Sequence, residues 1–433
     1  MRGEKRKNPA IVLDVQFRRK IGIAEAQHEL YILNIEPSQT ILALTNSSFP
    51  TGQVCKLQRS LYGLKQASRQ CFARLPSFLL SAGYHHSIAD HSLFLKFSDS
   101  TTTALLVYMD DIILASNNLS KIRRITHLLD LTFRIKDLGN LKFFLGLEVA
   151  RSHSGIHLCQ RKYTLDLLFD TGMLACKPAS TPINYTARLH SASGVPLHDP
   201  SPYRRLVGRL IYLTTTRPDI AFAVQQLSQY MSAPTDVHLK AAFRTLRYLK
   251  QAPGSGLFFS STSSFQLNAF SDLDWAGCPD TRRSITDFSV YLGHSFISWR
   301  SKKQATVSKS SSEAEYHALA STTCEIQWLT FLLENLSVPF LRPSLLFCDN
   351  DSVLQIASNE VFHERTKHID INCHIIRDKT ASGLIKLLPI SSSMQLAHLF
   401  TKPLSPHLFH VSCSKLGILN IHSQLEGGSQ QPS

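Results

Sequence analysis

The chain has 433 residues, 43% of them hydrophobic, and its 46 Lys and Arg against 32 Asp and Glu give a formal net charge of +14. This length allows roughly two or three domains, and the apolar content excludes a chain that is disordered throughout. So basic a balance favours a polyanionic partner, usually nucleic acid, over a merely basic soluble protein.

The nine cysteines are scattered singly, without a CxxC pair. This pattern is typical of free thiols in a reducing compartment rather than of a disulfide scaffold or a zinc site. No apolar run approaches the ~20 residues that a membrane-spanning helix needs, and Phe17-Arg18-Arg19-Lys20 interrupts the one stretch that could form a signal-peptide core. We therefore expect an intracellular protein, in the cytoplasm or nucleus, without a membrane partner.

The first quarter of the chain gives weak signals. Short apolar runs at residues 10–13 and 30–35 are consistent with strands, and a loop follows near Pro50. The sequence pattern predicts a helix across residues 66–82, which Pro76 should kink or break.

Two adjacent carboxylates, Asp110 and Asp111, lie between apolar strands predicted at residues 104–108 and 112–115, with Met109 and Asp110 turning the chain. Burying either charge without a partner would cost several kcal/mol, and a tight turn that presents both to a divalent cation removes that cost. A solvent-exposed Asp-Asp turn is the alternative, and the flanking strands disfavour it. The pair therefore predicts a site for Mg²⁺ or Mn²⁺ of the kind that phosphoryl transfer uses.

The middle of the chain is predicted to be helical and basic. An amphipathic helix at residues 120–132 and a hairpin within 139–159 come first. The remaining elements are helices at 163–170, 203–213, 219–231 and 238–251, with a Ser-, Thr- and Pro-rich linker at 178–202 and a loop at 260–264.

The last block has the order of an α/β sheet, with three antiparallel strands followed by alternating helices and strands. Strands are predicted at 265–271, 289–292, 295–299, 345–348 and 384–389, and helices at 312–336, 352–358, 367–379 and 394–400. The tail after Pro406 is short and largely polar.

Three carboxylates stand at the ends of these elements: Asp272 after the first strand, Glu315 in the first turn of the long helix, and Asp349 after a later strand. One acidic residue at a strand end is usually a plain loop residue, but this combination is what a two-metal nuclease needs. Helical spacing selects Glu315, because it continues the apolar stripe of residues 318–333. Glu313 lies roughly 200° away and is interpreted as a solvent-facing charge or a partner of the helix dipole.

Several segments, in order from residue 54 to 403, resemble the C-terminal half of Pol polyproteins from Ty1/copia-type retrotransposons. They are Leu61–Ala67 (Leu-Tyr-Gly-Leu-Lys-Gln-Ala), Tyr108–Asp111, Phe144–Val149, Tyr203–Gly208, Thr216–Ile220, Ser271–Asp272, Glu313–Tyr316 and Cys348–Asn350. The resemblance implies a reverse transcriptase palm cut off at its N-terminal side, joined to a ribonuclease H domain, with RNA template, DNA primer and RNA/DNA hybrid as partners.

The resemblance also implies roles for single residues. Lys65 and Gln66 would line the incoming nucleotide near Tyr108, and the segment at 144–149 would help to hold the primer. Basic residues of a further matching segment would hold the hybrid's backbone, since Arg and Lys suit phosphates. They are Arg365 and Lys367, for which a solvated helix start is the alternative.

The chain departs from the family pattern at both sites. A third palm carboxylate is expected in a Leu-Asp-Val-Lys-Asn-Ala-Phe segment, and the only candidate is Asp14, whose following residues do not match. In the ribonuclease H part, His398 stands where the family has Asp. Imidazole adds no negative charge and prefers softer ions than Mg²⁺, so we expect a weakened nuclease.

The fold class that follows is α/β: an α+β palm fragment, a helical connection and a ribonuclease H-like domain with a mixed sheet. The predicted regions are 1–50 unassigned, 51–160 partial palm, 161–258 helical thumb or connection, 259–405 ribonuclease H-like and 406–433 tail. We expect a truncated reverse transcriptase/ribonuclease H fragment with an inactive polymerase. The alternatives are a stand-alone weakened ribonuclease H and a catalytically dead nucleic-acid-binding remnant.

Overall fold

The computed structural model describes residues 74–98, 100–109, 111–186, 188–358 and 370–421, and the backbone of 10–14, 19–27 and 30–34. The three short N-terminal ranges are β1 (Ala10–Asp14), β2 (Arg19–Gln27) and β3 (Leu30–Asn34), which pair antiparallel in that order. The strands predicted at 10–13 and 30–35 are confirmed, whereas β2 was not predicted.

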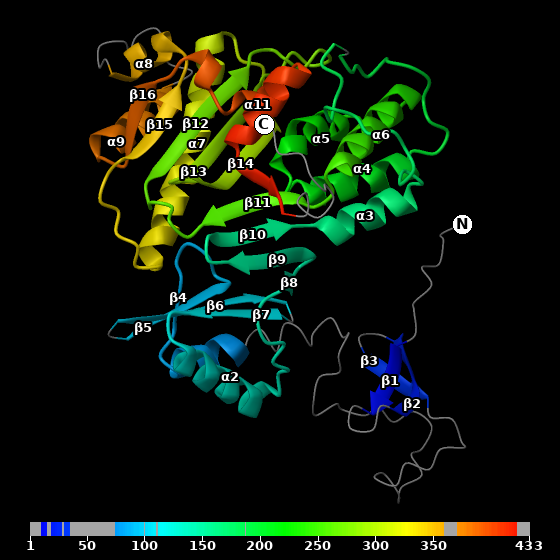
Figure 1. The fold of residues 1–433 in the computed structure, drawn as a ribbon, viewed down its shortest axis with the longest axis vertical. Coiled ribbons are helices and arrows are strands. Elements are labelled where there is room, and N and C mark those ends of the chain that lie inside the picture. The colour runs from blue at the N-terminus through cyan, green and yellow to red at the C-terminus, as the bar shows by residue number, and fades with distance from the viewer. Residues whose placement is uncertain are drawn as a thin grey trace, which may run out of the picture.

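The second sheet contains the predicted carboxylate turn. Its strands are β4 (His85–His86), β5 (Leu93–Ser98), β6 (Thr101–Tyr108) and β7 (Asp111–Ser116), antiparallel in chain order (Figure 1). Alternate residues of β6 are buried, as a sheet with one covered face requires. The helix over 74–81 and α2 (Leu119–Phe133) supply the covering side chains, among them Leu79 and Leu129.

A third sheet draws its strands from distant parts of the chain, in the order β17-β11-β10-β9-β8. These strands are β8 (Phe143–Phe144), β9 (Leu147–Ser152), β10 (Gly155–Cys159), β11 (Ser255–Ser260) and β17 (Ile418–Asn420). In Figure 1 this sheet lies between the β4–β7 sheet and the C-terminal sheet. It joins segments that the sequence places in the palm, the connection and the tail.

The helical connection is confirmed in the middle of the chain. It consists of α3 (Arg161–Asp170), α4 (Ser201–Leu213), the 3-10 turn η1 (Pro218–Ile220), α5 (Ala221–Ser228) and α6 (Asp236–Gln251). Apolar residues on α4 recur at helical spacing, from Tyr203 through Leu206 and Leu210 to Leu213, and all are buried in one shared core.

The C-terminal sheet has the order β14-β13-β12-β15-β16. Its strands are β12 (Leu267–Asp274), β13 (Ile285–Leu292), β14 (Ser295–Lys303), β15 (Ser344–Cys348) and β16 (Ile385–Pro389). β12–β13 and β13–β14 are antiparallel, while β15 runs parallel to both β12 and β16. The mixed α/β sheet expected from the sequence is therefore present.

Helices cover both faces of this sheet. The long helix α7 (Ser311–Asn335) packs on one face, where alternate residues of β12 and β13 such as Ala269 and Val290 meet it. The opposite face meets the connection helices and α10 (His398–Thr401), through residues such as Phe296 and Phe400. The remaining C-terminal helices are α8 (Asp351–Ser358), α9 (Asp370–Ala381) and α11 (Pro406–Lys415), with a 3-10 turn η3 (Ser392–Met394).

Several predicted elements differ from the structure. The strand expected at 289–292 begins at Ile285, and the helix expected at 219–231 is divided into η1 and α5. The helix expected at 394–400 is split into η3 and α10, because Gln395 is extended (φ −69°, ψ 107°) and its side chain donates to the carbonyl oxygen of Ser271 (2.9 Å). The tail after Pro406 forms α11 and β17 in its described part. Among the helices given above, none combines the length and apolar character that crossing a membrane requires.

Candidate functional site

Two carboxylates meet at one edge of the C-terminal sheet because their strands are parallel and in register. Phe270 of β12 pairs with Phe347 of β15, so Asp272 and Asp349 lie side by side, each two residues further along the chain. The two phenylalanine rings stack beneath them at 4.9 Å. The carboxyl ends of parallel strands in open α/β sheets are where ligand sites usually form.

Glu315 reaches the same edge from the other face of the sheet. It lies one turn into α7, whose N-cap is Ser310, and it is only 5% exposed. The thiol of Cys348, the last residue of β15, lies 3.5 Å from Oε1 of Glu315. The structure thus brings together Asp272, Glu315 and Asp349, the three residues that the sequence singled out.

The choice of Glu315 over Glu313 agrees with this geometry. Glu313 is buried, so the solvent-facing interpretation is wrong. Its Oε2 accepts the backbone N–H of Lys309 (2.6 Å) at the start of the helix, which suits a carboxylate at a helix N-terminus.

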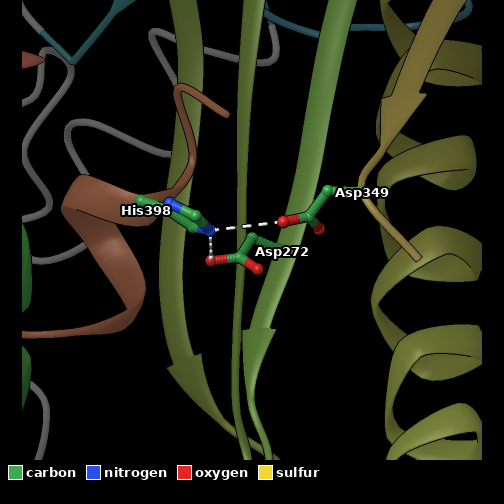
Figure 2. Close-up of side chains that lie close together, drawn as sticks. All are labelled: Asp272, Asp349 and His398. Atoms are coloured by element: carbon green, nitrogen blue, oxygen red, sulfur yellow. Dashed lines mark ion pairs between the residues drawn. The ribbon is translucent and has the colours of Figure 1, made fainter. Parts of the chain in front are cut away.

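His398, the first residue of α10, lies between the two strand-end carboxylates. Its Nε2 is 3.5 Å from Oδ2 of Asp272 and 3.5 Å from Oδ2 of Asp349 (Figure 2). Figure 2 shows the three side chains pointing toward one another from three separate elements. The imidazole therefore occupies the position from which a fourth carboxylate would face the other two.

Hydrogen bonds fix the orientation of the two aspartates. The hydroxyl of Thr401 donates to Oδ2 of Asp272 (2.7 Å), and the hydroxyl of Ser392 donates to Oδ2 of Asp349 (2.8 Å). Both hydroxyls belong to the segment 392–401, which is held to the sheet by the buried ring of Phe400. This segment therefore positions the site as well as covering it.

The surroundings raise the pKa values of two of the three carboxyl groups and lower that of the third. Burial, together with the nearby charges of Asp272 and Asp349, raises the pKa of Glu315 to about 8. Burial also raises the pKa of Asp272, although His398 and Thr401 oppose the change. Hydrogen bonding to His398, more than any other interaction, lowers the pKa of Asp349 to about 2. Divergent pKa values within one group of carboxyls are typical of functional sites.

A fourth carboxyl group, Asp287, was not predicted from the sequence. It lies on β13 directly across from Asp272 and is fully buried. Burial, reinforced by the charge of Asp272, raises its pKa well above the ordinary value. The signal that could have revealed it is an Asp within an apolar strand, but the strand was predicted to begin only at Ser289.

The predicted carboxylate turn lies between β6 and β7. Tyr108 at the end of β6 pairs with Asp111 at the start of β7, and Met109 has a φ of 51°. Tyr108, Met109 and Asp111 are exposed. Asp110 lies outside the described residues, as do Lys65, Gln66, Arg365 and Lys367.

The structure does not bring Asp14 to this turn by strand pairing. Asp14 ends β1, which pairs with β2 at Arg19 rather than with any strand of the β4–β7 sheet. The turn and the β12–β15 edge are thus two separate groups of acidic residues.

Residues 29–185 match the family model of the reverse transcriptase (RNA-dependent DNA polymerase). The retrovirus-related Pol polyprotein from transposon RE1 of Arabidopsis thaliana is 44% identical over 85% of this chain. The chain belongs to the Ty1/copia-type retrotransposon Pol family. This Pol chain spans 25% of the length of the RE1 polyprotein.

The chain is also similar to a shorter plant protein and to a solved viral structure. The uncharacterized mitochondrial protein AtMg00810 of Arabidopsis thaliana is 44% identical over 52% of this Pol chain and 93% of its own length. Among solved structures, that of the foamy viral protease-reverse transcriptase in complex with RNA/DNA hybrid matches with a TM-score of 0.40 and 10% identity. The match covers 80% of this chain and 40% of that one.

Proposed function

We propose that this Pol fragment cleaves the RNA strand of RNA/DNA hybrids, using Mg²⁺ or Mn²⁺ held by Asp272, Glu315 and Asp349. One observation carries the proposal: carboxylates from β12, from the residue that follows β15 and from the N-terminal part of α7 converge at one sheet edge. Membership of the Pol family supports the same proposal.

The donor set fits a divalent cation. Asp272, Asp349 and His398 each offer one ligand atom, and these atoms lie within 4.8 Å of one another. Glu315 adds a carboxylate from below, close enough for its pKa to respond to both aspartates. Two carboxylates and an imidazole bind Mn²⁺ well, whereas Mg²⁺ prefers oxygen ligands alone. We therefore expect Mn²⁺ to support cleavage better than Mg²⁺.

A bound divalent cation would supply stabilisation of the charge that develops on the attacked phosphate and would activate a water molecule. The protein side chains provide the ligands and hold them in position. Hydrogen bonds from Thr401 and Ser392 hold Asp272 and Asp349 in place. Because Glu315 is buried, few water molecules can compete with its carboxylate for the cation. His398 contributes no negative charge, so cation binding should be weaker than with four carboxylates.

The test is cleavage of a hybrid whose RNA strand is end-labelled, with the full chain in Mn²⁺ or Mg²⁺. We expect cleavage that Asp349→Asn abolishes and that His398→Asp strengthens by roughly tenfold or more, since it restores an oxygen ligand. Asp378→Asn, an exposed position on α9, is the matched control and should cleave like the wild type.

Two results would contradict the nuclease proposal. Salt-sensitive hybrid binding without cleavage in either metal would identify a catalytically dead nucleic-acid-binding remnant. Cleavage that persists in Asp349→Asn would place the chemistry elsewhere or in a contaminant.

RNA-directed DNA synthesis is the second candidate, favoured by the paired and exposed residues Tyr108 and Asp111 at the ends of β6 and β7. We expect little or no primer extension on an RNA template, because β1, which carries the third-carboxylate candidate Asp14, does not pair with the β4–β7 sheet. Robust synthesis that Asp110→Asn abolishes would overturn this expectation.

A further inference from the structure

An exposed indole ring lies just beyond the sheet edge that carries the carboxylates. Trp275 directly follows Asp274, the last residue of β12, and comes three residues after Asp272. An extended chain advances ~3.3 Å per residue, so the backbone of Trp275 lies roughly 10 Å from that of Asp272. Trp275 is 51% exposed, whereas Asp272 is only 5% exposed. Single apolar residues are common on protein surfaces, so exposure alone does not indicate a role.

The backbone around Trp275 is held in a strained turn. Ala276 has a φ of 53°, in the left-handed region that a residue with a Cβ rarely adopts. Its N–H donates to the hydroxyl of the buried Ser284 (3.2 Å), and the N–H of Gly277 donates to the carbonyl oxygen of Asp274 (3.2 Å). A Cβ added at Gly277 would clash with the carboxylate of Asp274. Backbone strain of this kind is typical of functional sites, where the surroundings hold it in place.

The ring of Trp275 is also fixed. Its Nε1–H donates to the carbonyl oxygen of Ser308 (3.4 Å), a buried residue shortly before α7. The hydroxyl of Ser308 donates to Oε1 of Gln304 (2.9 Å), and the amide of Gln304 donates to the carbonyl oxygen of Ala314 in α7 (3.0 Å). This chain of hydrogen bonds ties the indole to the helix that carries Glu315. The ring is therefore exposed and yet held in one orientation relative to the site.

Basic side chains accompany the indole. Burial raises the pKa of Asp274, the neighbour of Trp275, and the positive charges of Lys402 and Arg188 oppose this change. Lys and Arg suit phosphate groups, and an aromatic ring suits the apolar face of a sugar or a base. A nucleotide presents a phosphate and a sugar side by side, so this edge of the site matches a nucleic-acid strand.

We propose that Trp275 packs against a sugar in the minor groove of an RNA/DNA hybrid and thereby favours the hybrid over a DNA duplex. This inference rests on the proposed function, whose site it extends. An A-form duplex has a deep, narrow major groove that side chains cannot enter and a wide, shallow minor groove that they can. RNA/DNA hybrids are bound through their A-form geometry, whereas the minor groove of B-DNA is only about 6 Å wide.

The separation of Trp275 from Asp272 fits this role. Successive nucleotides of a strand advance ~3.4 Å along the duplex axis. A backbone separation of roughly 10 Å thus corresponds to about three nucleotide steps. Trp275 would contact the substrate within that distance of the attacked phosphate. It is therefore a positioning residue that selects the duplex and does not take part in the reaction.

The experiment measures binding without cleavage. A labelled RNA/DNA hybrid and a DNA duplex of the same sequence are titrated in EDTA with full-length wild type, Trp275→Ala, Trp275→Phe and Trp328→Ala, and fluorescence anisotropy gives the affinities. Trp328 is the matched control: it is 41% exposed, and its Nε1–H also donates to a backbone carbonyl oxygen, that of Ala89 (3.0 Å). It lies roughly 20 Å along α7 from Glu315. Urea unfolding checks that each variant folds, and tryptophan emission is recorded with unlabelled hybrid.

We expect Trp275→Ala to weaken hybrid binding by at least about fivefold and DNA-duplex binding by less than about twofold. Trp275→Phe should keep most of the affinity, and Trp328→Ala should bind like wild type. The salt dependence of hybrid binding should have the same slope in Trp275→Ala and wild type, because an indole neutralises no phosphate. Wild-type emission should shift to shorter wavelength as the hybrid displaces water from the ring, and Trp275→Ala should lack this shift.

Three results would overturn the role of Trp275 and leave the proposed function intact, since cleavage in Mn²⁺ is measured separately. They are hybrid binding by Trp275→Ala at wild-type affinity, an equal loss for hybrid and DNA duplex, and an equal loss in Trp328→Ala. If wild type neither binds nor cleaves the hybrid, the proposed function fails together with this inference.

Discussion

Glu315 and Asp349 belong to the same site, yet the pKa of Glu315 is raised and the pKa of Asp349 is lowered. Glu315 approaches from the covered side of the sheet, where burial and two carboxylate neighbours favour its neutral form. Asp349 lies at the open end of β15, where His398 and the hydroxyl of Ser392 favour its ionised form. A cation placed between them would lower the pKa of Glu315, because a nearby positive charge stabilises the carboxylate.

Glu315→Gln tests this difference as a dependence of stability on pH. In the metal-free folded chain the pKa of Glu315 is about 8, raised from 4.5. Between these values the folded state binds more protons than the unfolded state, so the free energy of unfolding falls as pH rises through about 4.5 to 8. The Gln variant lacks this loss and should be more stable than wild type at pH 9, by on the order of 3 kcal/mol.

The measurement is urea unfolding in EDTA at pH 5, 7 and 9, comparing each variant with wild type at the same pH. Glu334→Gln, on an exposed face of the same helix, is the control. A difference between Glu315→Gln and wild type that stays constant from pH 5 to 9 would contradict the prediction.

At the scale of the elements, periodicity predicted most of what the structure contains. The long helix α7 and the strands β6, β7, β12 and β15 have strong apolar patterns, and each was placed within a few residues. β11 and β17 were missed because each is short and depends on pairing with a distant partner. Asp287 was missed for a related reason, since only the cross-strand register places it beside Asp272.

One buried network joins elements of the connection. The guanidinium of Arg217, just before η1, donates through Nε and Nη2 to the carboxylate of Asp219 (2.9 and 2.7 Å) and through Nη1 to the carbonyl oxygen of Ala252 (2.9 Å). The hydroxyl of Tyr248 on α6 donates to Oδ2 of the same aspartate (2.5 Å). Arg217 and Asp219 are only 2% and 3% exposed, so solvent cannot replace a lost partner.

Arg217→Met should therefore destabilise the chain by about 3–5 kcal/mol, because it leaves the buried carboxylate of Asp219 without its cation. The exposed pair Arg209–Asp170 provides the comparison. Arg209→Met should cost only about 0–1 kcal/mol, as surface ion pairs usually do. Urea unfolding at pH 7 measures both, and similar losses in the two variants would contradict the prediction.

For the whole molecule, the net charge of +14 sets how a nucleic acid would bind. Each phosphate that Lys or Arg neutralises releases counterions, so affinity falls linearly on logarithmic axes as salt rises. We predict that hybrid affinity, measured by fluorescence anisotropy in EDTA to prevent cleavage, falls by at least about tenfold between 50 and 200 mM salt. A salt-independent affinity would show that basic side chains do not contact the phosphates.

The pairing of β17 with β11 has a consequence for how the chain is made. On the ribosome, β11 emerges long before residues 418–420, and at roughly 5–20 residues per second the stretch between them takes on the order of ten to thirty seconds to synthesise. During that interval the edge of β11 that β17 later covers stays open, and open strand edges invite pairing with other chains. Nascent copies of this protein should therefore need chaperone protection at that edge. Deletion of residues 416–433 removes β17, so the edge of β11 should stay uncovered after synthesis is complete.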